Sequence, residues 1–348
     1  MKRNLLILLM LISAVLFTAC TTKTKSDIKA TPAPTGATAS ESPEVTEGQK
    51  EKVKINITAL KGPTAIGMVK VMDDSASGKT ANDYDFKIAG APEELTVGIV
   101  KGDIDIAAVP CNLASVLYNK TNGAIKMAGI NTLGVLYIVE TGDTIKTVED
   151  LKGKTIYSTG LGTTPQYTLN YLLTSHGINP EKDVTIEYKS EPTEVASLLE
   201  KSGNAIAMLP QPYVTTVMMK NPKVHIALDV AKEWDKSSKG GSSVVTGVVI
   251  VNKKFLEKNQ QAFDDFMKEY KKSSTFVNLN KEEASALVEK FDIFKAAPIK
   301  KAIPYCNITM IQGDDMKKKV SGYLDTLFRQ NPKAVGGKLP DDNFYYVQ

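Results

Sequence analysis

Four short segments of the chain carry residue types that could hold a small molecule. Glycine lets a ligand approach the backbone, and threonine, asparagine and glutamine offer neutral hydrogen-bonding groups. Each segment comes just before a predicted helix, whose first N–H groups favour oxyanions and carbonyl oxygens. The sequence therefore predicts these ligand-binding residues: Gly62, Pro63, Thr64, Pro110, Cys111, Asn112, Gly160, Gly162, Thr163, Thr164, Pro210, Gln211 and Pro212.

The same segments hold little that could catalyse a reaction. None of them contains Asp, Glu or His, so general acid–base catalysis lacks its usual residues. The glycine-rich stretch from Gly160 to Pro165 lacks the third glycine of a dinucleotide fingerprint and the Gly-Lys of a phosphate-binding loop. We predict no catalytic residue, no metal ligand and no cofactor. Taken singly, each segment could equally be ordinary turn and helix-capping chemistry.

Arginine is almost absent, and this narrows the ligand. The chain has only Arg3 and Arg329, whereas amino-acid and many carboxylate sites rely on a guanidinium group. We therefore expect a neutral, aromatic or small oxyanionic ligand, with Lys61 as an optional point charge. One or two tyrosines near turns or strand ends could stack on a flat ligand: Tyr84, Tyr137, Tyr157, Tyr167 and Tyr213.

The elements that would position these segments alternate between strand and helix. Apolar residues at every second position from Val53 to Ala59 predict a strand, and β-branched or apolar runs predict others at 103–109, 154–158, 205–209 and 243–251. Helical periodicity follows from Leu113, over 165–176, from Tyr213, over 255–277 and over 281–291. This alternation predicts an α/β architecture.

An internal repeat suggests two similar lobes. Residues 94–110 and 194–210 share five identities: Glu, Lys, Ile, Ala and Pro at 94, 101, 106, 107 and 110 and again 100 residues later. Ligands of open α/β sheets bind beyond the carboxyl ends of strands, so two facing lobes would surround one cleft with four turns. We expect lobe 1 to comprise 53–137 plus 250–348, and lobe 2 to comprise 138–249. Crossings near 137–141 and 243–251 would form a hinge.

The N-terminus is typical of an export signal. Lys2 and Arg3 precede an apolar run from Leu5 to Phe17, which is too short for a membrane-spanning helix. The following Thr-Ala-Cys20 resembles the lipobox of bacterial lipoproteins, although Phe17 replaces the usual leucine. We predict a signal peptide over 1–19, lipidation of Cys20 and a disordered tether over 20–52, which would hold the protein on the extracytoplasmic face of the cell membrane. The alternative is a plain signal peptide with an incidental cysteine.

Overall composition fits a globular body and excludes several classes. The 348 residues are 42% hydrophobic and 24% charged, and a net charge of +4 does not favour nucleic-acid binding. Three cysteines exclude a disulfide scaffold, while pairing of Cys111 with Cys306 stays open. We interpret His176 and His225 as structural, and Trp234 as a surface anchor or a residue of the cleft rim.

Four stretches together resemble a known family. They run from Val100 to Pro110, Thr147 to Ile156, Gly160 to Pro165 and Val249 to Leu256. They are similar to lipoprotein substrate-binding proteins of ABC importers, in the nitrate/sulfonate/taurine branch that includes thiamine-pyrimidine binders. The resemblance covers roughly 53–319.

This resemblance implies a two-lobed periplasmic-binding-protein fold of type II. It also implies a monomer without a cofactor that delivers a small molecule to a permease and its ATPase. Two alternatives remain open: an enzyme on the same fold acting on a small cyclic or aromatic precursor, and an extracellular sensor partner without transport.

Overall fold

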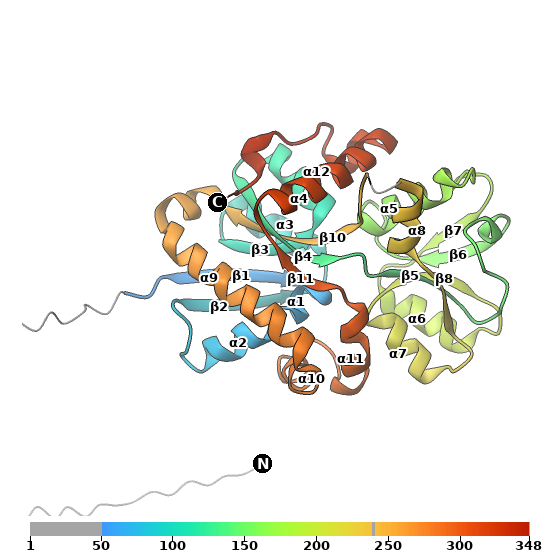
Figure 1. The fold of residues 1–348 in the computed structure, drawn as a ribbon, viewed down its shortest axis with the longest axis horizontal. Coiled ribbons are helices and arrows are strands. Elements are labelled where there is room, and N and C mark those ends of the chain that lie inside the picture. Colours follow the sequence, from blue (N-terminus) through green and yellow to red (C-terminus); the bar gives the residue numbers. More distant parts are fainter. Residues whose placement is uncertain (1–50, 239–240, 348) are drawn as a thin grey trace, which may run out of the picture. The chain divides into compact units, whose positions relative to one another are not determined.

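Two β-sheets with helices on both faces organise the described part of the chain (Figure 1). This computed structural model describes residues 51–238 and 241–347. The predicted signal peptide, Cys20 and nearly all of the predicted tether lie outside the described residues. No helix in the described ranges is both long and apolar enough to cross a membrane.

The first sheet has six strands in the order β11-β4-β10-β3-β1-β2. Strand β1 runs parallel to β2 and β3, whereas β10 is antiparallel to β3 and β4, and β11 is antiparallel to β4. The strands are β1 (Lys54–Leu60), β2 (Asp83–Ala89), β3 (Ile106–Pro110), β4 (Ile125–Leu133), β10 (Val245–Asn252) and β11 (Ile308–Ile311). We call this sheet and the helices packed on it the first lobe.

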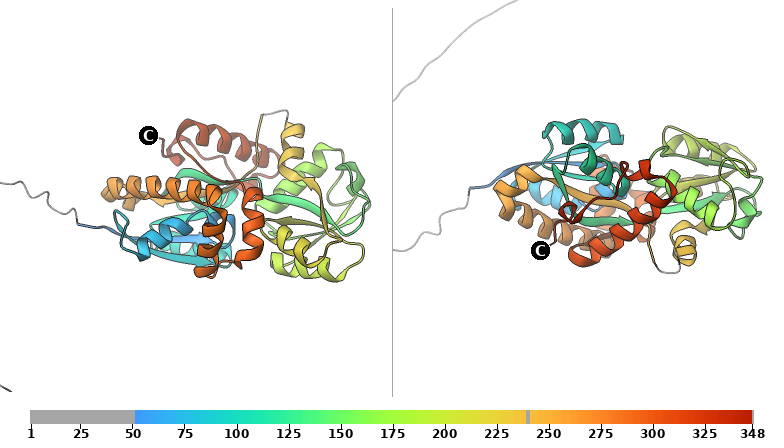
Figure 2. Two further views of the ribbon diagram at one scale, coloured as in Figure 1. Left: turned by 60° about the horizontal axis from the view of Figure 1, so that its bottom comes forward. Right: turned by 90° about the horizontal axis from the view of Figure 1, so that it is seen from above.

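Helices of the first lobe come from both ends of the described chain. They are α1 (Pro63–Ile66), α2 (Val69–Ala76), α3 (Pro92–Lys101), α4 (Cys111–Lys120), α9 (Lys253–Leu279), α10 (Lys281–Lys290), α11 (Ala296–Ala302) and α12 (Gly313–Gln330). Short 3-10 turns, η2 (Ile303–Tyr305), η3 (Pro332–Val335) and η4 (Asp342–Phe344), complete it. Helix α9 buries Phe263, Phe266 and Tyr270, as its predicted amphipathic pattern requires. Because α9 and α12 join different core clusters, they cover opposite faces of the sheet (Figure 2).

The second sheet has five strands in the order β7-β6-β8-β5-β9. Its strands are β5 (Leu136–Glu140), β6 (Thr155–Ser158), β7 (Thr185–Tyr188), β8 (Ile206–Pro210) and β9 (His225–Asp229). Its helices are α5 (Thr164–Ser175), α6 (Pro192–Lys201), α7 (Tyr213–Lys220) and α8 (Val230–Ser238), with a 3-10 turn η1 (Glu149–Leu151). We call these elements the second lobe.

The two sheets share one topology. Read as β2-β1-β3-β10-β4 and β7-β6-β8-β5-β9, they match strand for strand, with the last two strands of each antiparallel to their neighbours. Gly247 faces Pro110 in the first sheet, and Leu136 faces Pro210 in the second. Helices α3 and α6 span the same positions 100 residues apart. The repeat in the sequence therefore corresponds to a repeated structural unit.

The chain passes between the sheets twice, at places that differ from the expected boundaries. Strand β4 leads into β5 through Gly134 and Val135, and α8 leads back to β10. Leu136 and Tyr137 thus belong to the second sheet, and 245–249 to the first. The run at 245–249 pairs with β3 and β4, which sets its sheet. Both passages touch, since a Cβ on Gly134 would lie 3.4 Å from the Cβ of Val244, which directly precedes β10.

Trp234 corrects another expectation, because it is wholly buried rather than a surface or rim residue. Its ring lies 4.0 Å from that of Tyr171 on α5 and 5.3 Å from that of Tyr323 on α12. The indole N–H donates to Ser242 Oγ at 3.2 Å. Although neighbouring residues are charged, Trp234 fills the seam between the lobes, where apolar area from three helices can be buried together.

Candidate functional site

The four predicted segments lie at the carboxyl ends of four strands. Gly62-Pro63-Thr64 follows β1, and Pro110-Cys111-Asn112 spans the end of β3 and the start of α4. In the second lobe Gly160 to Thr164 follows β6, and Pro210-Gln211-Pro212 ends β8. Since β1 neighbours β3 and β6 neighbours β8, each sheet brings its two segments to one edge.

Asn112 and Thr164 connect the second and third segments. The Thr164 hydroxyl donates to Asn112 Oδ1 at 3.0 Å, and Asn112 Nδ2 donates to the carbonyl of Ala334 at 3.1 Å. Asn112 lies in the first turn of α4, whose N-cap is Pro110. The Asn112 amide joins both lobes to the 3-10 turn η3, so its two polar atoms already have protein partners.

The glycine-rich third segment turns back on itself. Gly160 and Gly162 adopt φ of 74° and 76°, the left-handed region that favours glycine. The N–H of Gly162 donates to Gln166 Oε1 at 2.7 Å, and that of Thr163 donates to the carbonyl of Gly160 at 3.0 Å. The expectation that this turn leaves free N–H groups is wrong for these two residues, because local partners occupy them.

In the first segment the threonine also bonds locally. Thr64 Oγ1 donates to the Leu60 carbonyl at 2.5 Å, and the Thr64 carbonyl accepts from the Tyr270 hydroxyl at 3.1 Å. Lys61 is exposed, with its ammonium 5.7 Å from the centre of the Phe294 ring. The first segment is therefore anchored to α9 through Tyr270.

Gln211, in the fourth segment, is buried with one end of its amide unused. Its Oε1 accepts from the N–H of Thr215 at 3.2 Å and from the Thr215 hydroxyl at 2.9 Å. Its backbone N–H donates to the carbonyl of Val135 at 3.0 Å. The side chain is 1% exposed, yet Nε2 has no hydrogen-bond partner among the described residues.

Three polar residues that sequence reasoning missed lie at the same end of the first sheet. Asn131 and Thr132 lie near the end of β4, and Thr246 lies near the start of β10. Asn131 Oδ1, Thr132 Oγ1 and Thr246 Oγ1 are all buried without a partner among the described residues. The signal was present as polar residues inside two otherwise apolar strands, but only pairing shows that the strands adjoin.

Gly247 creates the space that these side chains use. It pairs with Pro110 on one side and Thr132 on the other, so the three residues form a row across the sheet. A Cβ on Gly247 would lie 2.5 Å from Asn131 Oδ1 and 2.7 Å from the Thr64 methyl group. The absence of a side chain thus lets Asn131 and Thr64 pack over this row.

The lobes touch through several further contacts. Thr168 Oγ1 and the Tyr323 hydroxyl lie 3.1 Å apart between α5 and α12. On the α7 side, the Tyr213 ring packs edge-on against Phe294, with centres 5.4 Å apart. The Tyr137 hydroxyl donates to the Tyr305 carbonyl at 3.2 Å. The four contacts at Asn112, Thr168, Tyr213 and Tyr137 join the lobes in the described arrangement.

The five tyrosines expected as stacking candidates have protein partners. Burial raises the pKa of Tyr213 to about 12 and raises the pKa of Tyr137 above its ordinary value. Tyr84 packs on Phe266, and Tyr157 lies under the ammonium of Lys189. Tyr167 is buried beside the first lobe's core. A stacking role for any of them stays a prediction.

The two remaining cysteines are free and buried. Cys111 packs in the core cluster that contains α12, and Cys306 packs in the cluster that contains α9. Burial raises the pKa of both thiols, which keeps them in their neutral form. The open question of their pairing is thus answered by two separate thiols on opposite faces of the first sheet.

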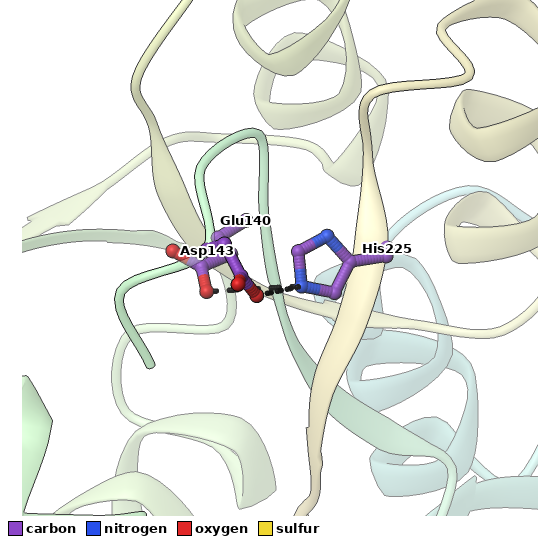
Figure 3. Close-up of side chains that lie close together, drawn as sticks. All are labelled: Glu140, Asp143 and His225. Carbon is purple, nitrogen blue, oxygen red and sulfur yellow. Dashed lines mark ion pairs between the residues drawn. The ribbon is translucent and has the colours of Figure 1, made fainter. Parts of the chain in front are cut away.

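One group of His, Asp and Glu lies at the far end of the second lobe (Figure 3). Among the described residues, Glu140, Asp143 and His225 bring ligand atoms within 4.8 Å of one another. His225 Nε2 is 3.8 Å from Glu140 Oε1 and 3.9 Å from Asp143 Oδ1. These are donor types that Zn²⁺ accepts.

Local bonding assigns this group to the structure of a loop. The Glu140 carboxylate is wholly buried and accepts from the N–H groups of Thr144 and Ile145, at 2.9 Å each, and from the Thr144 hydroxyl. Pairing with Lys146 lowers the pKa of Asp143. Because its oxygens are committed to the backbone, Glu140 holds the turn between β5 and η1 closed.

Known proteins resemble this chain in sequence over part of its length and in fold over most of it. The family model described as "NMT1/THI5 like" matches residues 125–284. No curated protein matches the chain. A solved ABC transporter protein from Parabacteroides distasonis is 25% identical, with a TM-score of 0.70 over 84% of this chain and 99% of that one.

Two further structures are named for their ligands. The periplasmic aliphatic sulphonate binding protein SsuA of Escherichia coli is 15% identical, with a TM-score of 0.66 over 83% of this chain and 92% of that one. The periplasmic nitrate-binding protein NrtA of Synechocystis is 13% identical, with a TM-score of 0.55 over 76% and 75%. The family resemblance drawn from the sequence and the two-lobed α/β fold of periplasmic-binding-protein type II are thereby confirmed.

Proposed function

We propose that this chain is a non-catalytic substrate-binding protein that holds a small molecule where the two sheets meet. Four buried polar atoms without a partner in residues 51–238 and 241–347 carry the proposal: Asn131 Oδ1, Thr132 Oγ1, Thr246 Oγ1 and Gln211 Nε2. Buried polar groups in folded proteins are nearly always hydrogen-bonded, so such a group of orphaned atoms marks a place that a ligand completes. The fold shared with periplasmic binding proteins supports this reading.

The chemistry of the site favours a ligand that is held without an arginine side chain. All four atoms belong to neutral amides and hydroxyls, which suit a neutral or aromatic compound or a small oxyanion. Arg329 lies on α12, exposed and paired with Asp325 at 2.9 Å. The thirteen predicted residues are retained in the proposal with divided roles: Gln211 and the strand ends face the ligand, whereas Asn112 and Thr164 join the lobes.

The proposed binding would serve transport of the ligand into the cell. Ligand would stabilise the closed arrangement of the lobes, which a permease and its ATPase would then recognise. Lipidation of Cys20 and a tether over 20–52 would keep the monomer at the extracytoplasmic face of the membrane. Support comes from the sequence of the N-terminus and from the ABC transporter protein and the periplasmic binding protein named among structures of this fold.

Mass spectrometry of small molecules released from the purified chain tests the binding function. We expect a co-purified compound that raises the melting temperature when it is added back to stripped protein. A chain that releases no compound and is stabilised by none of a broad metabolite panel would contradict the proposal.

The membrane anchor needs a separate test. In bacteria, Cys20→Ala should move the protein from the membrane fraction to the soluble extracytoplasmic fraction or leave it unprocessed. Cys111→Ala, which alters a buried thiol elsewhere, is the matched control and should stay membrane-bound. Unchanged attachment of Cys20→Ala would show that lipidation is not the anchor.

A further inference from the structure

Bonding to neighbours fixes the orientation of the Gln211 amide. Oxygen Oε1 accepts from both the N–H and the hydroxyl of Thr215. A flipped amide would place its NH2 group against the Thr215 N–H, which can only donate. Nε2 therefore has to be the free end, and this buried atom can only donate a hydrogen bond.

A chain of hydrogen bonds fixes Asn131 in the same way. The Tyr270 hydroxyl has one proton and donates it to the Thr64 carbonyl at 3.1 Å. Its oxygen can then only accept, and the partner at 3.0 Å is Asn131 Nδ2. The free end of the Asn131 amide is therefore Oδ1, over Gly247, and this buried atom can only accept.

The two amides are linked through the segment that joins the sheets. Val135, whose carbonyl receives the Gln211 N–H, is four residues beyond Asn131, a span of at most about 14 Å along an extended chain. Thr132 and Thr246 can donate or accept, so they do not discriminate between ligands. Asn131 and Gln211 do discriminate, because each has a single remaining role.

We infer that the ligand carries an N–H or O–H donor for Asn131 Oδ1 and an acceptor for Gln211 Nε2. This inference rests on the proposed function and narrows its ligand class. Nitrate and a plain alkanesulfonate are acceptors only, so either would set an oxygen lone pair against Asn131 Oδ1 and leave that buried acceptor unpaired. The chain thus selects donor-bearing molecules over nitrate and unsubstituted alkanesulfonates.

Matched pairs of compounds test this selection directly. Taurine and ethanesulfonate differ by an ammonium donor, and nicotinamide and nicotinate differ by an amide N–H; nitrate serves as a pure acceptor. Stripped protein is titrated calorimetrically with each probe and with any co-purified compound. We expect each measurable binder to carry a donor, and the acceptor-only member of its pair to bind at least about 10-fold more weakly.

Variants then test whether Gln211 and Asn131 are the residues that select the ligand. Gln211→Glu keeps an oxygen toward Thr215 but replaces the free donor with an acceptor, and Asn131→Leu removes the free acceptor. Each should weaken the donor-bearing ligand about 5- to 100-fold. The urea midpoint of each variant is measured beside its affinity, which separates lost recognition from lost folding. Gln330→Leu, which removes another unpartnered buried amide nitrogen on α12, should bind normally.

The outcomes separate this inference from the function on which it rests. Tight binding of nitrate or ethanesulfonate would overturn the donor requirement and leave the binding function standing. Equal affinities in all variants would place the ligand elsewhere and also overturn the inference. Absence of any bound compound would remove the proposed function, and the inference with it.

Discussion

The two lobes share one sheet topology but differ in which end of their antiparallel strands carries buried polar residues. In the first lobe Asn131, Thr132 and Thr246 lie at the strand ends that face the proposed site. The ladder position of Gly247 is taken in the second lobe by Leu136, since each pairs with the proline that closes a parallel strand. The two lobes therefore share a backbone arrangement but carry different side chains at equivalent positions.

The opposite end of the sheets shows the reverse pattern. Val251 pairs with Ile106 in the first sheet, whereas Glu140 pairs with Ile206 in the second. The buried Glu140 holds a loop, while Val251 packs in a core. On their antiparallel strands, the first lobe therefore carries polar residues suited to binding, whereas the second carries a polar residue that stabilises its own fold.

The largest expected effect is a loss of stability caused by a change in the second lobe. Glu140→Ala leaves the N–H groups of Thr144 and Ile145 without their acceptor inside the protein, so we expect a loss of about 2–4 kcal/mol of unfolding free energy in urea titration. Asp143→Ala removes an exposed carboxylate of the same cluster and should change stability by less than about 0.5 kcal/mol. Equal effects of the two would refute a structural role for Glu140.

A methyl group at Gly247 should break the first lobe's site. Gly247→Ala places a Cβ against Asn131 Oδ1 and the Thr64 methyl group, and overpacking of this kind costs about 1–3 kcal/mol. Displacement of Asn131 should also weaken ligand binding. Gly203→Ala, whose added Cβ meets nothing within 4 Å, is the control and should leave affinity and urea midpoint unchanged.

Removing the hydrogen bond between Thr164 and Asn112, which joins the lobes, should have a smaller effect on stability. Thr164→Val removes the donor to Asn112 Oδ1 while keeping the side chain's shape, so we expect a loss of about 0.5–1.5 kcal/mol of unfolding free energy. Asn112→Ala should cost more, because it also removes the contact with Ala334. Double-mutant analysis with both changes should show non-additive losses, and strict additivity would argue against direct coupling.

Lowering the pH should have the smallest effect on folding stability, and this effect should arise in the second lobe. His176 Nδ1 lies 2.7 Å from Glu149 Oε1, and this hydrogen bond lowers the pKa of Glu149 to about 2. The contact therefore stabilises the fold above about pH 4.5 and is lost as the pH falls toward 2. Because Glu149 is largely exposed, the contribution should stay below about 1 kcal/mol.

Urea titrations at pH 6 and pH 3 measure this effect. His176→Gln should reduce the difference between the two pH values slightly. His225→Gln removes the other histidine of the same lobe and controls for a general loss of charge. A wild-type difference that is unchanged in His176→Gln would assign the acid sensitivity to other carboxylates.

Local patterns were enough to predict most of the fold. Alternation around Ile55 and Ile57 predicted β1, and the spacing of Phe263, Phe266 and Tyr270 predicted the buried face of α9. Boundaries between lobes were harder, because an apolar run such as 245–249 suits a buried strand of either sheet. Only its ladder partners decide which sheet it joins.

The candidate site residues show the same division between what local sequence predicts and what tertiary contacts decide. Glycine, proline and threonine after a strand predicted where four turns fall, since these residue types act through local geometry. Whether a polar atom stays free depends on distant groups: Asn112 is taken by Ala334 and Thr164, whereas Gln211 keeps a free Nε2. Local sequence contains no information about such partners.

The sequence by itself determined the alternation of strands and helices, the repeat and the family resemblance, because periodicity and short motifs depend on residues close along the chain. Tertiary structure alone decided that Asn131, Thr132 and Thr246 lie beside the row of Pro110 and Gly247. Those residues are brought together by pairing of β10 with β3 and β4 across more than 100 positions. Hydrogen bonding and burial depend on neighbours in space, and folding alone supplies those neighbours.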